Sequence, residues 1–496
     1  MMTITELQQR YAAHPNVEAM SGLLKNPSVR TLFCGGLCAS AASLFSSVLV
    51  QRGEFPFVFI LGDLEEAGYF YHDLTQVLGT DKVLFFPSSF RRAIKYGQKD
   101  AANEILRTEV LSRLQKGEEG LCVVTYPDAL AEKVVSRKEL GDKTLKLHSG
   151  ENVDTNFIME VLRSYGFEYV DYVYEPGQYA VRGSIIDVFS FSSEFPYRID
   201  FFGDEVESIR TFEVETQLSK EKKDSIVIVP DLSRSLEQGG ASGMVSFLDF
   251  LSADTVLAMR DLLWLRERIQ TVHDETLTPQ AIAAREAEES GCITLDGKLI
   301  DGSEFTLRAL DFRRMEFGNK PTGTPDATIT FDTSAQPIFR KNFDMVAESF
   351  KEYMEKGYAL YICSDSMKQT DRIRAIFEDR GDQIAFTAVE RTLHEGFADN
   401  ALRLCIFTDH QLFDRFHKYN LKSDKARSGK VALSLKELNQ FTPGDYVVHT
   451  DHGVGRFSGL VRIPNGDTTQ EVMKLVYQNE DVVFVSIHSL HKVSKY

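Results

Sequence analysis

The stretch from Gly177 to Arg210 constrains the fold of this chain more than any other part of the sequence. It reads GQYAVRGSIIDVFSFSSEFPYRIDFFGDEVESIR, with short runs of β-branched and aromatic residues. Small polar residues interrupt these runs at Ser192-Ser193 and at Gly203-Asp204, where strands turn. The stretch therefore predicts successive β-strands.

The run YRIDFF predicts a sheet with two different faces. Side chains on a strand alternate between the faces, so Ile199 and Phe201 are expected on one face and Arg198, Asp200 and Phe202 on the other. A sheet with one apolar face normally exposes its opposite face to water. An exposed face that carries both an arginine and a phenylalanine is therefore unusual.

The run YAVRGSI adds a second arginine to the same argument. Alternation places Val181 and Ile185 on one face, and Ala180, Arg182 and Ser184 on the other. Arginine and aromatic side chains are the residues that most often anchor protein–protein interfaces. The polar face of this sheet is therefore predicted to be a docking site.

An ion pair within the sheet is the competing interpretation of Arg198. If Gly203-Asp204 is a two-residue hairpin turn, Asp200 faces Glu207, and Arg198 lies opposite Ile209 with Glu207 on its diagonal. That pair would explain the arginine without any partner. It gives no reason for a phenylalanine on the same face, which favours the docking site.

The totals indicate a multidomain protein without strong affinity for nucleic acid. A chain of 496 residues is too long to fold around a single hydrophobic core. Its formal net charge of −17 argues against non-specific DNA binding, which depends on neutralising phosphates. The six cysteines make neither a disulfide framework nor a zinc site. No signal peptide or membrane-spanning run is present in the sequence, so a cytoplasmic protein is expected.

Residues 30–62 have the strand–turn–helix–strand rhythm of a parallel α/β unit, with a glycine turn where a phosphate-binding loop would lie. That loop requires glycine, four residues, and then Gly-Lys-Ser/Thr. Counting from Gly35 in the Gly35-Gly36 turn, the last three places hold Ser40, Ala41 and Ala42. The lysine and the magnesium-binding hydroxyl are missing. The sequence therefore predicts a degenerate loop that binds no nucleotide.

Changes in sequence pattern divide the chain into α/β and β segments. An α+β module is predicted to be inserted in the first α/β domain, because the buried run KDSIVIVPDLS indicates a return to the first sheet. Residues 245–330 are expected to be helical with polar loops, and a second, smaller α/β domain follows. The predicted segments are 1–133, 134–218 (the inserted module), 219–334 (the return), 335–420, a linker 421–440, and a small β-barrel 441–496.

Two histidine motifs suggest chemistry, but neither supports a catalytic or metal site. Asp409-His410 lies at a strand end without a nucleophile, glycine elbow or metal spacing, so a structural polar pair is favoured. His449 and His452 lie three apart on a turn, with no cysteine or carboxylate in register. No catalytic residue and no metal ligand is therefore predicted.

The opening stretch resembles a segment shared by the bacterial transcription-repair coupling factors and the UvrB damage-recognition helicase. That segment has an aromatic-x-x-Arg-Gly strand, a Pro-x-Arg strand ending in Phe-Phe, and an acidic-x-acidic-Ser-hydrophobic-Arg strand. The matching residues are Tyr179, Arg182, Gly183, Pro196, Tyr197, Arg198, Phe201, Phe202, Glu205, Glu207, Ser208 and Arg210. The resemblance implies that Arg182, Arg198 and Phe202 bind UvrA.

The C-terminal motif GDYVVH-x-x-HGVGRFSGL resembles the RNA-polymerase-interacting module that coupling factors share with CarD-type transcription regulators. In that module a strand adds to an edge of the polymerase β subunit. By this resemblance Ile463 is the apolar contact, with Leu460, Val461 and Arg462 beside it. The competing interpretation of Ile463 is an ordinary core residue of a small barrel.

The resemblance implies an interaction scaffold with α/β multidomain architecture: a degenerate UvrB-like domain with its inserted module, a small α/β domain, and a CarD/Tudor-like barrel. The chain itself would be no enzyme and would hold no cofactor. A longer parent, extending beyond Tyr496, would be an ATP- and Mg²⁺-dependent translocase on double-stranded DNA. The alternatives are a nucleotide-dependent UvrB-like helicase fragment, for which ATP binding is decisive, and a CarD-like regulator that does not bind UvrA.

Overall fold

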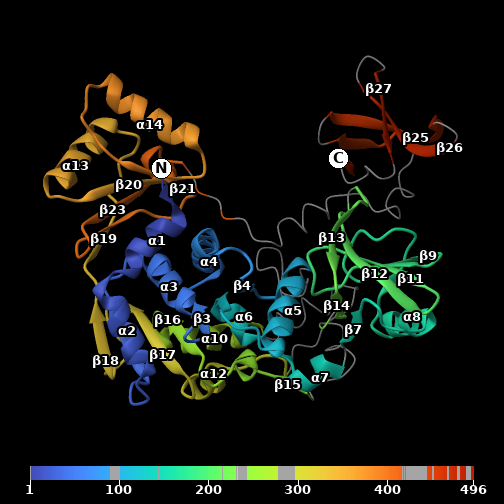
Figure 1. Ribbon diagram of the computed structural model, residues 1–496, viewed down its shortest axis with the longest axis horizontal. Coiled ribbons are helices and arrows are strands. Elements are labelled where there is room, and N and C mark those ends of the chain that lie inside the picture. The colour runs from blue at the N-terminus through green and yellow to red at the C-terminus, as the bar shows by residue number, and fades with distance from the viewer. Residues whose placement is uncertain are drawn as a thin grey trace. The chain divides into compact units, whose positions relative to one another are not determined.

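The computed structural model divides the chain into two compact units (Figure 1). Unit 1 comprises residues 1–137 and 236–421, and unit 2 comprises 138–235 and 422–496. The structure describes the chain except residues 1, 90–100, 143, 215, 231, 233–242, 277–296, 416, 418, 420–443, 450–451, 466–467, 478–480, 487–492 and 496, and except the side chains of 101–102, 462–471, 486 and 493–495.

The first lobe of unit 1 is built on a seven-stranded sheet in which every pair of neighbouring strands is parallel. Four of its strands, β16, β3, β5 and β4, are fully buried, as their near-continuous apolar runs predict. In sheet order they are β18 (Ala327–Thr330), β2 (Thr31–Gly35), β17 (Arg313–Gly318), β16 (Val256–Met259), β3 (Phe57–Ile60), β5 (Cys122–Thr125) and β4 (Val83–Phe86).

Helices and short strands complete the first lobe (Figure 1). Several begin at side-chain caps, such as Asp63 at the start of α4. The elements are α1 (Ile4–Ala12), α2 (Pro15–Lys25), α3 (Ala41–Arg52), α4 (Leu64–Leu78), α5 (Ala101–Lys116), α6 (Pro127–Ala131), β6 (Val134–Val135), α7 (Arg137–Asp142, at the unit boundary), β15 (Met244–Val245), η1 (Phe247–Phe250), α10 (Leu262–Thr276) and α12 (Gly302–Ala309).

The prediction that residues 245–330 are helical was wrong for three segments. The strands β16, β17 and β18 lie there, and β16 occupies the middle of the parallel sheet. Its four apolar residues, VLAM, precede a true helix directly. A short buried strand of this kind carries no period-2 signal, so its periodicity does not distinguish it from a helix.

The second lobe of unit 1 contains a mixed six-stranded sheet flanked by α13 and α14 (Figure 1). Its edge strand comes from the N-terminus, where Met2 lies opposite Val389 in a parallel pair. In sheet order the strands are β1 (Met2–Thr3), β21 (Thr387–Glu390), β20 (Ala359–Ser364), β23 (Leu404–Thr408), β22 (Phe397–Asp399) and β19 (Thr333–Ala335), with helices α13 (Phe343–Glu355), α14 (Met367–Asp379) and α15 (Asp409–Leu412).

Residues 145–228 of unit 2 form a six-stranded sheet, a two-stranded sheet and one helix. The strands of the larger sheet, in order, are β13 (Ser219–Lys223), β12 (Glu205–Phe212), β11 (Tyr197–Phe202), β10 (Ile185–Val188), β9 (Gln178–Arg182) and β8 (Glu168–Tyr169). The helix is α8 (Thr155–Ser164). The smaller sheet pairs β7 (Leu145–His148) with β14 (Ser225–Ile228). The prediction that Ser225–Ile228 rejoins the first sheet was therefore wrong.

The C-terminal part of unit 2 is a five-stranded antiparallel sheet around a small core of Val447, Phe457, Met473, Leu475 and Val485. In order its strands are β27 (Val482–Ser486), β26 (Thr468–Val476), β25 (Gly453–Asn465), β24 (Tyr446–His449) and β28 (Val493–Lys495). The predicted α/β multidomain fold class is confirmed. No helix in the described part of the chain combines the length and apolarity that a membrane span requires.

Candidate protein-binding sites

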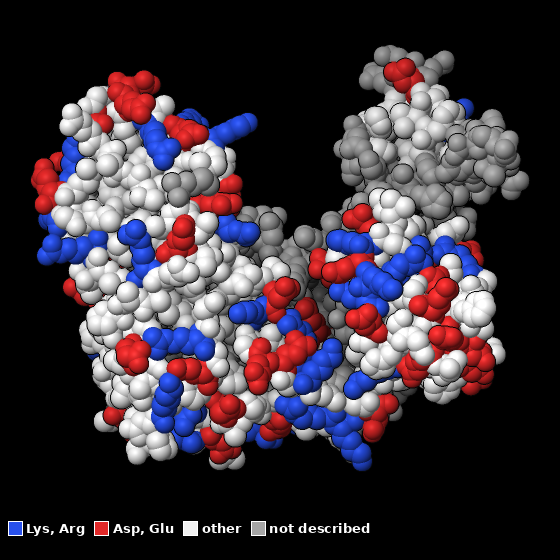
Figure 2. All heavy atoms as spheres, in the orientation of Figure 1, with Lys and Arg blue, Asp and Glu red and all other residues white. Residues whose placement is uncertain are grey.

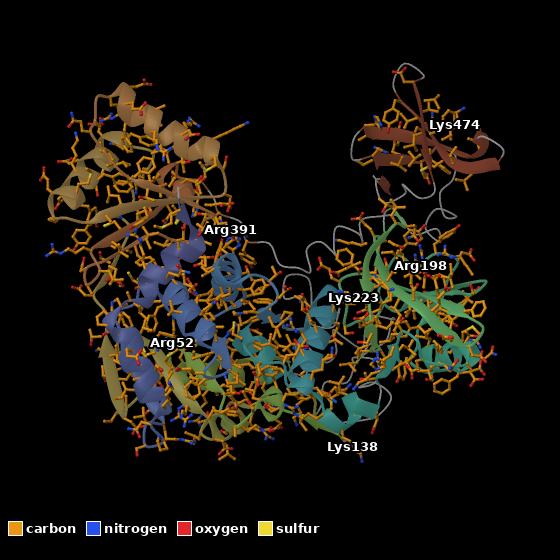
Figure 3. The ribbon with its side chains drawn as sticks, in the orientation of Figure 1. Arg52, Lys138, Arg198, Lys223, Arg391 and Lys474 are labelled. Carbon is orange, nitrogen blue, oxygen red and sulfur yellow. The ribbon has the colours of Figure 1, made fainter. Side chains whose placement is uncertain are left out.

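Arg182, Arg198 and Phe202, which sequence predicts as one docking site, lie on one face of the six-stranded sheet. Ala180, Asp187 and Arg198 lie opposite one another across β9, β10 and β11, so their side chains share this face. Arg182 is two residues along β9 from Ala180 and therefore has the same orientation. Figure 3 marks Arg198 on this sheet.

Asp187 binds both arginines. Its side chain is fully buried, and its Oδ1 accepts a hydrogen bond from Arg198 Nε at 2.8 Å. The Oδ2 atom accepts a second bond from Arg198 Nη2 at 2.9 Å and also pairs with Arg182 Nη2. A bidentate arginine–carboxylate pair away from water is a strong and directional interaction. Sequence analysis did not identify this residue.

Arg198 is built into the sheet. Only 14% of its side chain is exposed, and its guanidinium lies 4.4 Å from the centre of the Phe212 ring. Its Nη1 donates to the backbone oxygen of Gln217 at 3.1 Å. Hydrogen bonding to Asp187 raises the pKa of the Arg198 guanidinium. Because Asp187 and Gln217 already accept hydrogen bonds from its guanidinium, the main role of Arg198 is to position its neighbours.

Arg182 and Phe202 are the accessible members of the predicted site. The Arg182 side chain is 34% exposed, with its guanidinium 4.9 Å from the centre of the Tyr172 ring. Phe202 ends β11 and is 78% exposed. Exposure of one phenylalanine costs little by itself, but an exposed phenylalanine and an accessible arginine on one face have the composition of an interface anchor.

Two predictions about register were wrong. A bulge between Asp200 and Phe201 places Asp200 opposite Ser208, and Arg198 opposite Arg210, instead of Glu207 and Ile209. The bulge consists of one extra residue in β12. It shifts by one position the residues of β12 that lie opposite β11 beyond that point. The predicted diagonal ion pair with Glu207 therefore does not form; Arg198 pairs with Asp187.

The second error concerns Ile185. It lies opposite Arg182 and therefore shares the face of the arginines, whereas Val181 lies opposite Ile186 on the other face. The turn between β9 and β10 interrupts the alternation that the prediction extended across it. The two arginines themselves are placed as predicted.

In the C-terminal sheet, the predicted residues Leu460, Val461, Arg462 and Ile463 lie in the second half of β25. Here β25 pairs with β26 on one side, from Leu460 opposite Met473 to Asn465 opposite Thr468. On the other side of β25, strand β24 pairs with Gly453–Arg456 and does not reach Leu460. Within the described residues, no strand pairs with the other edge of Leu460–Asn465.

The direction of each backbone group in this half-strand follows from the hairpin. Two residues separate Asn465 from Thr468, and the pair that closes such a hairpin exchanges hydrogen bonds. Alternate residues then direct their N–H and C=O groups the other way, so Leu460, Arg462 and Pro464 face the unpaired edge. Pro464 lacks an N–H, and proline in a strand belongs at such an edge.

The side chains of this half-strand are only partly described. Leu460 is 37% exposed and Val461 is partly buried. The side chains of Arg462 and Ile463 lie outside the described residues, so the choice between an interface residue and a core residue at Ile463 stays a prediction.

The degenerate loop in the first lobe is occupied by the protein's own groups. Thr333 Oγ1 donates to Gly36 O at 2.6 Å and accepts from Cys38 N at 3.1 Å. Glu395 N donates to the side chain of Ser40, the residue before α3, at 2.9 Å. A side chain at Gly36, whose φ is +81°, would overlap the Phe331 carbonyl. The space in front of the first turn of α3, at Ser40, Ala41 and Ala42, is therefore already filled by other residues of the chain.

A cavity of about 360 Å³ lies at the carboxyl ends of β3 and β16, beside this loop. Nucleotides bind at this edge in parallel α/β sheets. Here the lining includes five carboxylates, with Arg260 and His394 as the basic side chains: Asp63, Glu65, Glu66, Asp73 and Glu395. A cavity lined by carboxylates, without the lysine of a phosphate-binding loop, repels the negative charge of a nucleoside triphosphate and so disfavours its binding. No metal-binding group of three or more ligands occurs among the described residues.

Two segments of the chain match known families. Residues 145–233 match the UvrB interaction domain, and residues 441–496 match the CarD-like/TRCF RID domain. A transcription-repair-coupling factor of Staphylococcus aureus (strain bovine RF122 / ET3-1) is 23% identical over 528 residues, covering 93% of this chain and 45% of the relative. The chain is a relative of the transcription-repair-coupling factors.

A transcription-repair-coupling factor of Bacillus subtilis (strain 168) is 22% identical over 533 residues, again covering 93% of this chain and 44% of the relative. The chain thus spans less than half the length of these two coupling factors. The resemblance seen in the sequence is confirmed; Arg182, Arg198 and Phe202 lie inside the UvrB interaction domain, and the unpaired edge of β25 lies inside the CarD-like/TRCF RID domain.

Proposed function

We propose that this chain is an adaptor of transcription-coupled DNA repair, which recruits UvrA through the UvrB interaction domain and binds the RNA polymerase β subunit through the CarD-like domain. The exposed Phe202, on the same face of the sheet as Arg182, supports the first contact most directly. The unpaired edge of Leu460–Asn465 supports the second. We place this adaptor in the cytoplasm, and any ATP-driven movement on double-stranded DNA in a motor outside residues 1–496.

The three predicted UvrA-binding residues take different roles in this proposal. Phe202 and Arg182 contact UvrA, because their side chains are accessible. Arg198, held by Asp187, Phe212 and Gln217, keeps Arg182 and the sheet in place. In Figure 2 the visible face of this module carries lysine and arginine beside acidic side chains, so charge alone does not define the site.

Phe202→Ala is expected to weaken UvrA binding by about 2 kcal/mol, or roughly 30-fold in Kd, because a desolvated aromatic anchor contributes that much to an interface. Binding to purified UvrA would be measured by titration calorimetry. Phe157→Ala is the matched control, since Phe157 is another exposed phenylalanine (53%) of the same module. An equal loss in both variants, or no loss in the first, would overturn the assignment of Phe202.

We also propose that the chain binds no ATP, so that it acts without a cofactor. Thr333 and Glu395 already bond to the degenerate loop, and the adjoining cavity is lined by carboxylates. Equilibrium dialysis with Mg-ATP at millimolar concentration should show no saturable binding, with a nucleotide-binding UvrB as the positive control. Saturable binding would revive the helicase alternative. Loss of UvrA binding with retained polymerase binding would leave the CarD-like regulator.

A further inference from the structure

Four histidines and a tyrosine gather at one place in unit 1. Tyr69 and His72 come from α4, His394 from the loop after β21, His410 from α15, and His417 from the segment that follows α15. The rings are in contact along the whole cluster. Of this cluster, sequence analysis considered only the Asp409-His410 pair, because Tyr69 and His72 are more than three hundred residues away in sequence.

The rings form a stack. The centroids of Tyr69 and His394 are 3.5 Å apart with an angle of 10° between the rings, and those of His410 and His417 are 4.3 Å apart at 14°. His72 meets His417 edge to face at 4.9 Å. Tyr69 Oη donates to the backbone oxygen of His417 at 2.9 Å, and His410 Nε2 lies 2.7 Å from the backbone oxygen of His394.

Tyr419 extends the contact onto a glycine of α4. Its ring lies edge to face with Tyr69, at 4.8 Å between centroids. A Cβ at Gly68 would overlap the Tyr419 ring. The helix therefore has a flat place at Gly68 where the ring rests, although glycine inside a helix costs up to about 1 kcal/mol relative to alanine.

The stack requires neutral imidazoles. Burial, together with mutual repulsion, lowers the pKa of His72, His394 and His417 to about 4 each, and burial lowers that of His410. Burial raises the pKa of Asp73 to about 6, so this carboxyl loses its charge before the imidazoles gain theirs. The other charged groups that face the cluster are Glu65, Asp365, Glu395, Asp409 and Arg415.

His417 and Tyr419, which pack against α4, lie close to the end of unit 1. Unit 1 extends to Leu421, and unit 2 resumes at Lys422 and leads to the CarD-like domain. We propose that Gly68, Tyr69 and His72 of α4 form a docking site for His417 and Tyr419 of the same chain, and that the site holds them only while its histidines are neutral. Release frees the His417 and Tyr419 side chains and uncovers this face of α4.

Trypsin cleavage after Arg415 measures docking in the full chain. Gly68→Leu fills the place of the Tyr419 ring and should raise the cleavage rate at the Arg415–Phe416 bond by ~10-fold or more, since proteolysis follows local opening. Gly22→Leu is the matched control, because Gly22 lies in α2 with open space around it. Cleavage after Arg113 in α5 reports any general unfolding.

A second pair of variants tests the requirement for neutral rings at one pH. His417→Phe keeps the stacking without a titrating group and should leave the Arg415–Phe416 bond protected at pH 7.5. His417→Lys places a permanent charge in the stack and should expose that bond as Gly68→Leu does. Equal cleavage in Gly68→Leu and Gly22→Leu would overturn the docking site. Equal cleavage in His417→Phe and His417→Lys would overturn its dependence on charge.

Discussion

Asp187→Ala is expected to destabilise the UvrB interaction domain by about 3–5 kcal/mol and to abolish UvrA binding. The substitution leaves Arg198, only 14% exposed, without the carboxylate that binds its Nε and Nη2 atoms. Removing one partner of a buried ion pair costs this much because the other charge stays desolvated. Arg182 loses its partner as well, so both predicted arginines lose their positions.

Native-state hydrogen exchange of peptides from residues 178–212 would measure this loss, because the full chain need not unfold in a single transition. Glu221→Ala is the control; its partner Lys223 is exposed on β13, and exposed pairs contribute little. Asp187→Asn keeps the shape and should have an intermediate effect. Unchanged protection in Asp187→Ala would show that the arginines do not depend on this carboxylate.

The shared face of Arg198 and Phe202 was predictable because its signal is local. Residues Arg198 to Phe202 alternate within a single strand, and period-2 geometry is independent of the rest of the chain. The same holds for the degenerate loop, whose missing lysine is read directly from the sequence. Where a strand is short and fully buried, as in β16, the local signal vanishes and the helix prediction fails.

Register and partner choice were not predictable, because they depend on neighbouring strands. The bulge at Asp200 shifts all β11–β12 pairs on the side away from the hairpin turn, and nothing in the local sequence marks it.

Asp187 had a signal: one carboxylate within the apolar run IIDVF, flanked by two strands that each carry an arginine. A charge in such a run requires a partner, which could have identified the ion pair.

The histidine cluster shows the other limit of sequence reasoning. His72 is more than three hundred residues from His394, and each has an unremarkable local context. Only the packing of the two lobes in unit 1 brings these rings together. Three pKa values lowered from 6.5 to about 4 mean that the stability they contribute is present above pH 6.5 and is lost as the pH falls toward 4.

Arg462→Pro is expected to weaken binding to the RNA polymerase β subunit by about 100-fold, or ~2.7 kcal/mol, while the C-terminal sheet stays folded. The N–H of residue 462 faces the unpaired edge of β25, so proline there removes a donor that an added strand would use and places a ring in its path. The sheet already accepts proline at residue 464 on this edge.

Glu471→Pro is the matched variant, because Glu471 lies opposite Arg462 in β26 and directs its N–H to the other edge of the hairpin. It should leave polymerase binding unchanged; a loss in Glu471→Pro alone would move the added strand to β26.

Arg462→Ala separates the contribution of the side chain from that of the backbone, and Ile463→Arg tests the predicted apolar contact. Val461→Pro removes a bond between β25 and β26 and should unfold the hairpin, so circular dichroism distinguishes a lost edge from a lost fold. Strand addition depends on backbone groups, so Arg462→Pro must weaken binding far more than Arg462→Ala if this edge is the docking site.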